Sequence, residues 1–360
     1  MELANCVVSN VNIMNPNSPE ALFRSKVIET SDTILVASHL APDLDAFCSA
    51  LLMSRTIQQN YTGKKIVTLF EDEPYGVSEL QGHDNIVNMP LENALDKYEP
   101  DGIIVVDTNR YKRITRLGEA ALWAHLQDHD VKTAVVDHHE LSGGDKFDVA
   151  IQDPTAPAAV QLVYDLLFNY YNMDRPKGYE LITLVGLIAD SGTFKYPYDY
   201  SQTKLILRDL EEHNVDSEKA MSIVYDLDED QQKIVNAFKR NLTRKDGFAY
   251  SYIGDLVASG WRKNNENPAK IKAACVSFGN KLTSKPIDAN WGFIVHPNPS
   301  KIKGQYYASF RSKDGAKNVT EISRRLGAGG GHKTAAGVAF EADNIKGAIQ
   351  LVLDTIADIG

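Results

Sequence analysis

The sequence predicts an α/β protein in which a first part built on a parallel sheet is followed by a helical linker and a smaller α+β part. Two observations predict this fold class. Over the first 200 residues, short apolar runs alternate with helical patterns, as in a parallel sheet with crossover helices. Beyond Gly247, apolar segments of strand length follow one another instead. With 360 residues, 43% hydrophobic and 24% charged, the chain is long enough for two domains.

The elements of the first part follow from its apolar spacing. A helix is expected from Ser18, whose side chain can cap it, with Pro19 in the first turn. Four short apolar runs predict strands at Thr33–Ala37, Lys65–Phe70, Gly102–Val106 and Thr133–Val136. Segments with apolar residues at helical spacing predict helices near Ala46–Asn60, Glu92–Lys97, Glu119–Asp128, Ala159–Asn169 and Tyr179–Ala189.

The second part begins after a polar stretch, Glu212–Arg244, whose helical spacing indicates an arm between two domains. We therefore expect a catalytic domain at 1–211, a helical linker at 212–246 and a substrate-binding domain at 247–360. Within the last domain the sequence predicts strands at Ala249–Ile253, Ala273–Phe278, Trp291–His296 and Gln305–Arg311, and helices near Val319–Leu326 and Ile345–Ile359.

Charge and composition exclude several classes of protein. The net charge of −10 argues against a protein that coats long nucleic acid, although residues 247–360 carry 15 basic and 9 acidic residues and the remainder 23 and 39. This division fits cations bound in the first part and a polyanion that bridges both; a solvated acidic surface is the alternative. No apolar run has the length of a membrane helix, and the N-terminus does not resemble a signal peptide. Three scattered cysteines (Cys6, Cys48 and Cys275) suit a reducing cytoplasm.

Acidic and imidazole side chains follow several of the predicted strands. The first strand runs into HLAPDLDAF, which carries His39, Asp43 and Asp45, and the third ends on Asp107. The fourth ends on the triplet Asp137-His138-His139, and Asp190 follows the apolar helix LITLVGLIA. Because ligands bind beyond the carboxyl ends of the strands in an open parallel sheet, we expect these side chains to meet at one edge.

So many carboxylates at one edge require divalent cations. Asp and His without Cys suit Mn²⁺, Mg²⁺ or Fe²⁺, with Zn²⁺ as a further option. Their number suggests two ions about 3.5–4 Å apart that share one carboxylate, and Asp107 at a central strand end is the expected bridge. Taken singly, Asp45 could be a helix N-cap and His39 a packed histidine, but the four clusters together favour the metal site.

The motifs HLAPDLDAF, IIVVDTN, VVDHHE and GLIADSGTF resemble, in order and spacing, those of the DHH phosphoesterase superfamily. YASFRSK and GAGGGHKTAAG, which starts at Gly327, resemble its small DHH-associated domain. The resemblance implies two ions, with Mn²⁺ favoured, and catalytic roles for Asp107 and His139, the latter beside the phosphate; Asp137 would orient the histidines. The implied ligands of the first ion are His39, Asp43 and Asp107, and those of the second are Asp45, Asp107, His138 and Asp190.

A glycine-rich loop gives the second part its expected function. Gly329–Gly331 allows close backbone approach to an anion, His332 and Lys333 add donors, and Arg311 can grip a phosphate bidentately. The resemblance implies the same region, with substrate-binding residues Arg311, Ser312, Gly330, Gly331 and His332. Two segments depart from the family pattern: Asp153–Gln161 carries prolines, and Trp261–Gly304 is longer than a compact domain of this kind requires, with no role assigned.

The resemblance implies a two-metal phosphodiesterase that hydrolyses short oligonucleotides to mononucleotides, with phosphatase activity on 3′-phosphoadenosine 5′-phosphate open. It is similar to nanoRNase-type oligoribonucleases and soluble dinucleotide phosphodiesterases. The alternatives are a cyclic-dinucleotide phosphodiesterase and, in a different class, a catalytically silent nucleotide-binding regulator. We expect a cytoplasmic protein without long double-stranded nucleic acid or membrane as partner. Cleavage polarity, base preference and a homodimeric state stay open.

Overall fold

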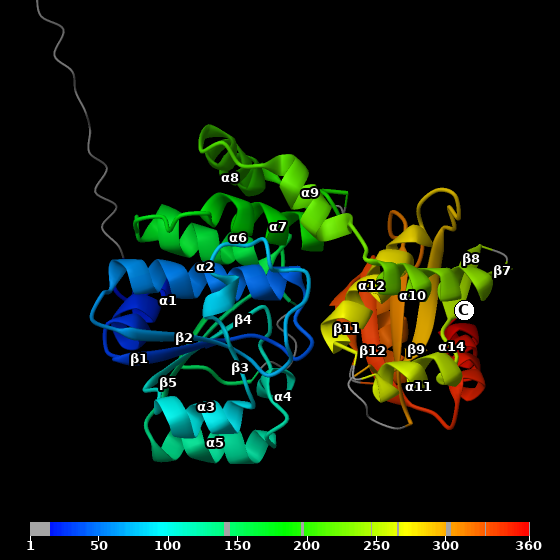
Figure 1. Cartoon of the computed structure of the whole chain (residues 1–360), viewed down its shortest axis with the longest axis horizontal. Coiled ribbons are helices and arrows are strands. Elements are labelled where there is room, and N and C mark those ends of the chain that lie inside the picture. The colour runs from blue at the N-terminus through cyan, green and yellow to red at the C-terminus, as the bar shows by residue number, and fades with distance from the viewer. Residues whose placement is uncertain are drawn as a thin grey trace, which may run out of the picture.

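Two six-stranded sheets organise the chain in the computed structural model, which describes residues 15–139, 145–195, 198–245, 247–264, 266–299, 304–327 and 329–359 (Figure 1). The first sheet has the order β3-β2-β1-β4-β5-β6 and is parallel throughout. The second has the order β11-β12-β10-β9-β8-β7 and is antiparallel except for the pair β8–β9. The predicted fold class is confirmed.

The first sheet consists of β1 (Thr33–Ala37), β2 (Lys65–Phe70), β3 (Val87–Asn88), β4 (Gly102–Val106), β5 (Lys132–Asp137) and β6 (Val149–Gln152). Three of the predicted strands have the predicted bounds. The helical segments around it are α1 (Pro19–Phe23), η1 (Arg24–Ile28), α2 (Leu44–Asn60), η2 (His83–Asn85), α3 (Leu91–Tyr98), α4 (Tyr111–Ile114), α5 (Glu119–Asp128), α6 (Ala159–Tyr164), η3 (Asp165–Tyr170), α7 (Tyr179–Ser191), α8 (Ser201–Glu212) and α9 (Ser217–Tyr225).

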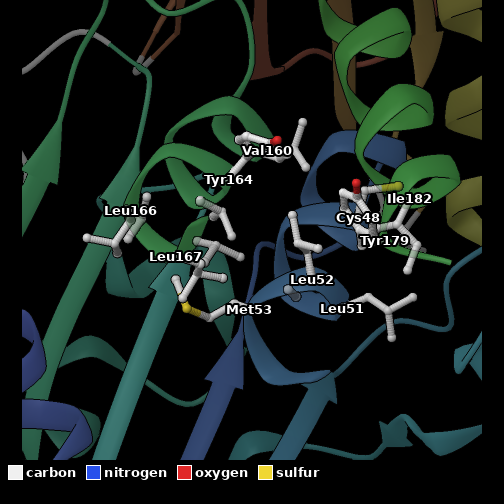
Figure 2. Packing of buried hydrophobic residues seen from close by; sticks show 14 of the residues in the cluster. Cys48, Leu51, Leu52, Met53, Val160, Tyr164, Leu166, Leu167, Tyr179 and Ile182 are labelled. Carbon is white, nitrogen blue, oxygen red and sulfur yellow. The ribbon is translucent and has the colours of Figure 1, made fainter. Parts of the chain in front are cut away.

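Both faces of the first sheet are covered, which explains why its strands read as continuous apolar runs. Ile34 and Val36 of β1 belong to the core under α2, α6 and α7, whereas Leu35 and Ala37 face α3 and α5 (Figure 1). Figure 2 shows the first of these cores, in which side chains of α2 pack against those of α6, η3 and α7. This packing fixes the α2 and α7 backbones relative to the strand ends.

Gly186 allows α7 to approach its neighbours closely. A Cβ at this position would lie 2.8 Å from Cγ1 of Val160 on α6 and 3.1 Å from Cβ of Cys48 on α2. Any larger residue would push α7 away from these two helices. Because Asp190 lies on the last turn of α7, this close packing also sets the position of its carboxylate.

The second sheet consists of β7 (Thr243–Lys245), β8 (Phe248–Tyr252), β9 (Trp291–Pro297), β10 (Gln305–Ser312), β11 (Gly330–His332) and β12 (Ala335–Glu341). Its helices are α10 (Glu229–Arg240), α11 (Asp255–Lys263), α12 (Pro268–Lys281), α13 (Val319–Leu326) and α14 (Ile345–Ile359). Phe238 of α10 stacks on Phe278 of α12, with ring centroids 5.0 Å apart. The expected arm Glu212–Arg244 thus contains two helices, α9 packed against α7 and α10 packed against α12.

The prediction of a strand at Ala273–Phe278 is wrong, because these residues lie inside α12. The side chain of Asn267 caps this helix by accepting hydrogen bonds from the N–H groups of Ala269 and Lys270, and Pro268 occupies its first turn. The short apolar run was compatible with either element by its length alone. No helix in the described part of the chain is long and apolar enough to cross a membrane.

The unassigned segment Trp261–Gly304 has a topological reason. Strands β8 and β9 follow one another in the chain and lie next to each other in the sheet, but they run parallel. Parallel strands need a crossover connection. Helices α11 and α12 form that crossover. The segment Trp261–Gly304 thus contains the end of α11, the whole of α12 and strand β9, and its length comes from this crossover.

Candidate metal centre

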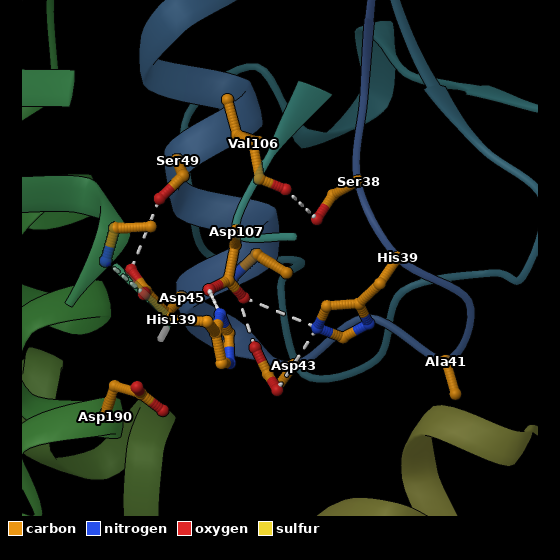
Figure 3. A network of polar contacts seen from close by, with 12 residues as sticks. Ser38, His39, Ala41, Asp43, Asp45, Ser49, Val106, Asp107, His139 and Asp190 are labelled. Carbon is orange, nitrogen blue, oxygen red and sulfur yellow. Dashed lines mark hydrogen bonds and ion pairs between the residues drawn. The ribbon is translucent and has the colours of Figure 1, made fainter. Parts of the chain in front are cut away.

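Three neighbouring central strands, β1, β4 and β5, deliver polar side chains to one edge of the first sheet. His39 follows the end of β1 by two residues, Asp107 follows β4 directly, and Asp137 is the last residue of β5. The Ser38 hydroxyl donates to the carbonyl oxygen of Val106 at 2.8 Å and ties two of these strand ends together. Figure 3 shows the side chains that meet at this edge.

The first group consists of His39, Asp43 and Asp107, whose ligand atoms lie within 4.8 Å of one another. Nε2 of His39 is 3.5 Å from Oδ2 of Asp43 and 3.4 Å from Oδ2 of Asp107. Nδ1 of His39 lies 2.9 Å from the carbonyl oxygen of Leu40, which leaves Nε2 to face the carboxylates.

Asp43, and not Asp45, is the N-cap of α2. Its Oδ1 accepts a hydrogen bond from the N–H of Ala46 at 3.1 Å, and its Oδ2 faces His39. One carboxylate thus serves the helix with one oxygen and the site with the other. The alternative considered for Asp45, a cap of its own helix, is wrong.

The second group consists of Asp45, His138 and Asp190. Nε2 of His138 lies 3.2 Å from Oδ2 of Asp190, 3.9 Å from Oδ2 of Asp45 and 3.4 Å from Oδ1 of Asp107. Nδ1 of His138 is 3.2 Å from the carbonyl oxygen of Ala156, so Nε2 is the nitrogen that faces the acids. The two oxygens of Asp107 therefore face two different groups, one each.

Asp45 also anchors a second helix. Its carboxylate accepts hydrogen bonds from the N–H groups of Ala159, at 2.7 Å, and Val160, at 3.0 Å, in the first turn of α6. Ser49 adds a third contact at 3.3 Å. These donors hold the carboxylate in place between α2 and α6.

His139 is paired with the first residue of its own triplet. Oδ1 of Asp137 lies 2.7 Å from Nδ1 of His139 and also accepts the backbone N–H of His139 at 3.2 Å. Nδ1 of His139 is 3.7 Å from Oδ1 of Asp107. A third group of ligand atoms, Asp107 with His138 and His139, is thereby also brought together.

Burial makes the charges of this edge strongly interdependent. Asp45, Asp107, Asp137, His39 and His138 are all buried. Burial, together with the charges of Asp107 and Asp190, raises the pKa of Asp45 well above its usual range. Burial would also raise the pKa of Asp107, but contacts with His138 and His39 hold it below its ordinary value. The protein alone thus cannot keep all these carboxylates ionised, and bound cations would relieve the repulsion.

The residues present fit a pair of divalent ions. Oδ1 of Asp107 is buried and accepts no hydrogen bond from the described residues, whereas buried carboxylate oxygens normally have a donor or a cation. Asp107 also has a left-handed backbone conformation, with φ of +58°, which is uncommon for a residue other than glycine. Strained backbone of this kind clusters at functional sites. Oxygen and imidazole ligands without thiolates match Mn²⁺ and related ions.

The expected substrate-binding residues lie on the second sheet. Arg311 of β10 pairs with Ala335 of β12, and Ala335 pairs in turn with His332 of β11. The backbones of Arg311 and His332 are therefore in register across three adjacent strands; the side chain of His332 lies outside what the structure describes. Nε of Arg311 donates to Oδ1 of Asn280 on α12 at 2.6 Å, which fixes the guanidinium. Ser312 is buried, and its hydroxyl accepts the N–H of Lys317 at 2.9 Å.

A backbone contact requires glycine at one of two neighbouring positions in this loop. Gly331 has φ of +130°, and a Cβ there would lie 2.4 Å from the carbonyl oxygen of Ala335. Gly330, its neighbour on β11, would meet nothing within 4 Å. The hairpin β11–β12 thus needs glycine at one of the two positions and leaves open space beside the other.

Lys272 is a residue of this site that the sequence did not reveal. Its Nζ lies 3.0 Å from Oδ2 of Asp43 and 3.1 Å from the carbonyl oxygen of Ala41. It belongs to α12 of the second domain and lies one residue before Ala273–Phe278, the run for which the sequence predicts a strand. Only the tertiary arrangement brings it to the edge of the first sheet.

Two family models match the chain in succession. Residues 33–188 match the DHH family, N-terminal domain, and residues 245–358 match the DHHA1 domain. The first match covers the candidate metal ligands from His39 to His138 and ends inside α7, two residues before Asp190. The second covers the second sheet and its helices.

Among curated proteins, the chain is similar to the probable bifunctional oligoribonuclease and PAP phosphatase NrnA of Streptococcus mutans. The two are 26% identical over 315 residues, which is 86% of this chain and 90% of the relative. The bifunctional oligoribonuclease and PAP phosphatase NrnA of Bacillus subtilis is 24% identical over 332 residues, 89% of this chain and 94% of the relative.

Among solved structures, the chain is similar to an exopolyphosphatase-related protein from Bacteroides fragilis, with a TM-score of 0.74 and 19% sequence identity. The alignment covers 94% of this chain and 96% of that protein. At this identity the similarity establishes the shared fold.

Proposed function

The chain belongs to the DHH family, with a DHH N-terminal domain followed by a DHHA1 domain, and on this basis we propose that it is a two-metal phosphodiesterase that hydrolyses short oligonucleotides to mononucleotides. The observation that carries the proposal is the position of Asp107 between two groups of ligand atoms. A carboxylate shared in this way suits a pair of ions at one phosphate. The similarity to two NrnA-type relatives over most of both chains supports the substrate class.

We assign the ligands of the two ions from these groups. His39, Asp43 and Asp107 would hold the first ion, and Asp45, Asp107, His138 and Asp190 the second. Two such ions, Mn²⁺ by preference of the ligand set, would lower the pKa of a water and neutralise charge on the phosphoryl oxygens.

The side chains of the DHH triplet have separate tasks in this proposal. The carboxylate of Asp137 is hydrogen-bonded to Nδ1 of His139, so Nε2 of His139 is the nitrogen available to the substrate. There it can stabilise the charge that grows on the phosphoryl oxygens or give a proton to the leaving oxygen. His138 instead presents Nε2 to the acids and serves the ions.

The second domain binds the rest of the substrate. We propose that Arg311, Ser312, Gly330, Gly331 and His332 form the site for the terminal nucleotide. The guanidinium of Arg311, already held by Asn280 through Nε, has donors left for a phosphate. Boundaries at 212 and 246 would place this site and the metal centre in different domains, with the substrate between them.

The same chemistry suits other phosphate esters as substrates. The relatives carry the name of PAP phosphatase as well as oligoribonuclease, so 3′-phosphoadenosine 5′-phosphate is a second candidate substrate. Cyclic dinucleotides are a further alternative. The acidic overall charge supports neither long duplexes nor an extended strand as substrate. The absence of paired cysteines among the described residues suits the cytoplasm.

The test is a length series of 5′-phosphorylated RNA from dimer to 20-mer, assayed with Mn²⁺ under single-turnover conditions at fixed base composition. The same panel includes cyclic dinucleotides, pyrophosphate and 3′-phosphoadenosine 5′-phosphate. We expect kcat/KM to be highest for two to about four nucleotides and to fall steeply with length, because the substrate must fit between two domains. Equal rates on dimers and 20-mers would contradict the short-substrate proposal, and Asp107→Ala provides the inactive control.

A further inference from the structure

Lys272 reaches from the second domain into the ligand set of the first. Its ammonium group contacts Oδ2 of Asp43, the same oxygen that faces Nε2 of His39. The other ion pairs that the six expected metal ligands form with described residues are with histidine or aspartate side chains. Lys272 is the one described lysine or arginine that forms an ion pair with any of these ligands. The metal edge of one domain therefore has a cation from the other domain beside it.

Neighbouring contacts fix the start of α12, and with it Lys272, against the first domain. Nδ2 of Asn267, the cap of α12, donates to the carbonyl oxygen of Glu73 at 3.0 Å. Nζ of Lys270 lies 3.0 Å from Oδ2 of Asp228, to which the hydroxyl of Tyr75 also donates. Both contacts lie within the five residues that precede Lys272, so the backbone of α12 is anchored here independently of the ion pair with Asp43.

The loop that receives Lys272 is held in an uncommon conformation. Ala41, between His39 and Asp43, has φ of +49°, which is rare for alanine. Its N–H donates to Oδ2 of Asp72 at 2.8 Å, and its carbonyl oxygen accepts from Lys272 at 3.1 Å. The backbone of this loop thus offers Lys272 a second partner that is not a candidate metal ligand.

The ion pair itself is easily exchanged. The side chains of Lys272 and Asp43 are 32% and 40% exposed, and an ion pair that solvent reaches in this way is weak. A divalent ion on Asp43 would engage the same carboxylate. Lys272 would then keep the Ala41 carbonyl and have its other donors available.

The charge balance shows what those donors would bind. The five aspartates of the edge (Asp43, Asp45, Asp107, Asp137 and Asp190) carry five negative charges when ionised, and two divalent ions supply four positive ones. A phosphodiester at the ions adds a further negative charge. A lysine beside the first ion compensates it directly.

We propose that Lys272 is a phosphate-binding residue, supplied by the DHHA1 domain to the phosphate at the metal centre. Asp43 and a phosphate oxygen are alternative partners of its ammonium group, and a metal ion on Asp43 favours the phosphate. The inference rests on the proposed function of this site. It gives the second domain a contact with the reacting phosphate itself, in addition to the distal contacts at Arg311.

The experiment measures phosphate binding without turnover. Full-length protein saturated with Mg²⁺ is titrated with inorganic phosphate by calorimetry, for the wild type, Lys272→Gln and Lys272→Arg. Lys233→Gln on α10 is the matched control, since Lys233 is 73% exposed and pairs with Asp230 on the surface. Bound Mn²⁺ is counted separately by electron paramagnetic resonance.

We expect Lys272→Gln to weaken phosphate binding about 10- to 100-fold, the loss of one charge-assisted hydrogen bond. Lys272→Arg should keep part of the affinity, Lys233→Gln should match the wild type, and all variants should bind two ions. A phosphate Kd within twofold of the wild type in Lys272→Gln would overturn the inference, as would weaker binding that accompanies the loss of an ion. If the wild type does not hydrolyse oligonucleotides, the proposed function is refuted. The phosphate affinities of the variants can still be compared, because they are measured without turnover.

Discussion

Asp137 binds His139 twice, since one carboxylate oxygen lies 2.7 Å from Nδ1 of the imidazole and 3.2 Å from its backbone nitrogen. Asp137 is completely buried, whereas His139 is part-exposed toward the site. This arrangement fixes both the rotamer of the ring and the nitrogen that it presents. Asp137 is therefore a positioning residue for His139 in the proposed reaction.

Asp137→Asn should lower kcat about 10- to 100-fold, the usual effect of losing an acid that orients a neighbouring histidine. KM and the number of bound ions should stay unchanged, because the side chain contacts neither Arg311 nor the second ligand group in the described structure. Steady-state kinetics and elemental analysis check this. The control is Asp130→Asn, on a side chain that is 89% exposed. Loss of an ion in Asp137→Asn would make Asp137 a ligand instead.

Asp107→Ala should abolish binding of both ions together with activity, because its two oxygens face the two ligand groups. Asp45→Asn should mainly lose one ion, while its amide oxygen can keep one of the two hydrogen bonds that Asp45 accepts from the start of α6. Elemental analysis of the purified variants decides between these outcomes, with circular dichroism to show that each is folded. Two ions and normal turnover in Asp107→Ala would disprove the bridging role.

Metal loading should stabilise the first domain measurably. An ion present at 100 times its Kd adds about 2.7 kcal/mol to the free energy of unfolding. We expect a rise in Tm of several degrees when Mn²⁺ is added to chelator-treated protein. Differential scanning calorimetry of the wild type and Asp107→Ala makes the comparison. An equal rise in both proteins would place the stabilising ions elsewhere.

Arg311→Ala should raise KM strongly and leave the metal content intact, since Arg311 lies on the second sheet. The loss of a buried charged contact suggests about 2–5 kcal/mol of binding free energy. Asn280→Ala, which removes the side chain that holds Nε of Arg311, should give a smaller effect in the same direction. The control is Arg325→Ala, an arginine of α13 that is 54% exposed. Unchanged KM on a dinucleotide would refute the phosphate contact.

Most of the metal edge could be predicted from the sequence because His39, Asp107 and Asp137 lie at or just beyond the ends of apolar strands. Asp107 directly after β4 is the clearest case. The second domain was less predictable. The apolar run at Ala273–Phe278 is too short to distinguish strand from helix, and its partners, α10 and the second sheet, are distant in the sequence.

Two further differences have local causes. Asp190 lies in the last turn of α7 and not in a loop, because the helix continues to Ser191 and ends at Gly192 with φ of +60°. Strand β6 was not predicted because it is a half-exposed edge strand whose apolar run, Val149–Ile151, is short. Lys272 could not be predicted at all, since its role depends on the contact between two domains.

The parallel pairing of β8 and β9 has a consequence for the order of folding. The two strands cannot pair as a hairpin, so their registry awaits the formation and docking of α11 and α12, and such non-local closure is slow. Lys272 travels on that connection. Pulsed amide hydrogen exchange should therefore show the backbone of α12, which carries Lys272, becoming protected among the last events of folding, after the metal ligands of the first domain are in place.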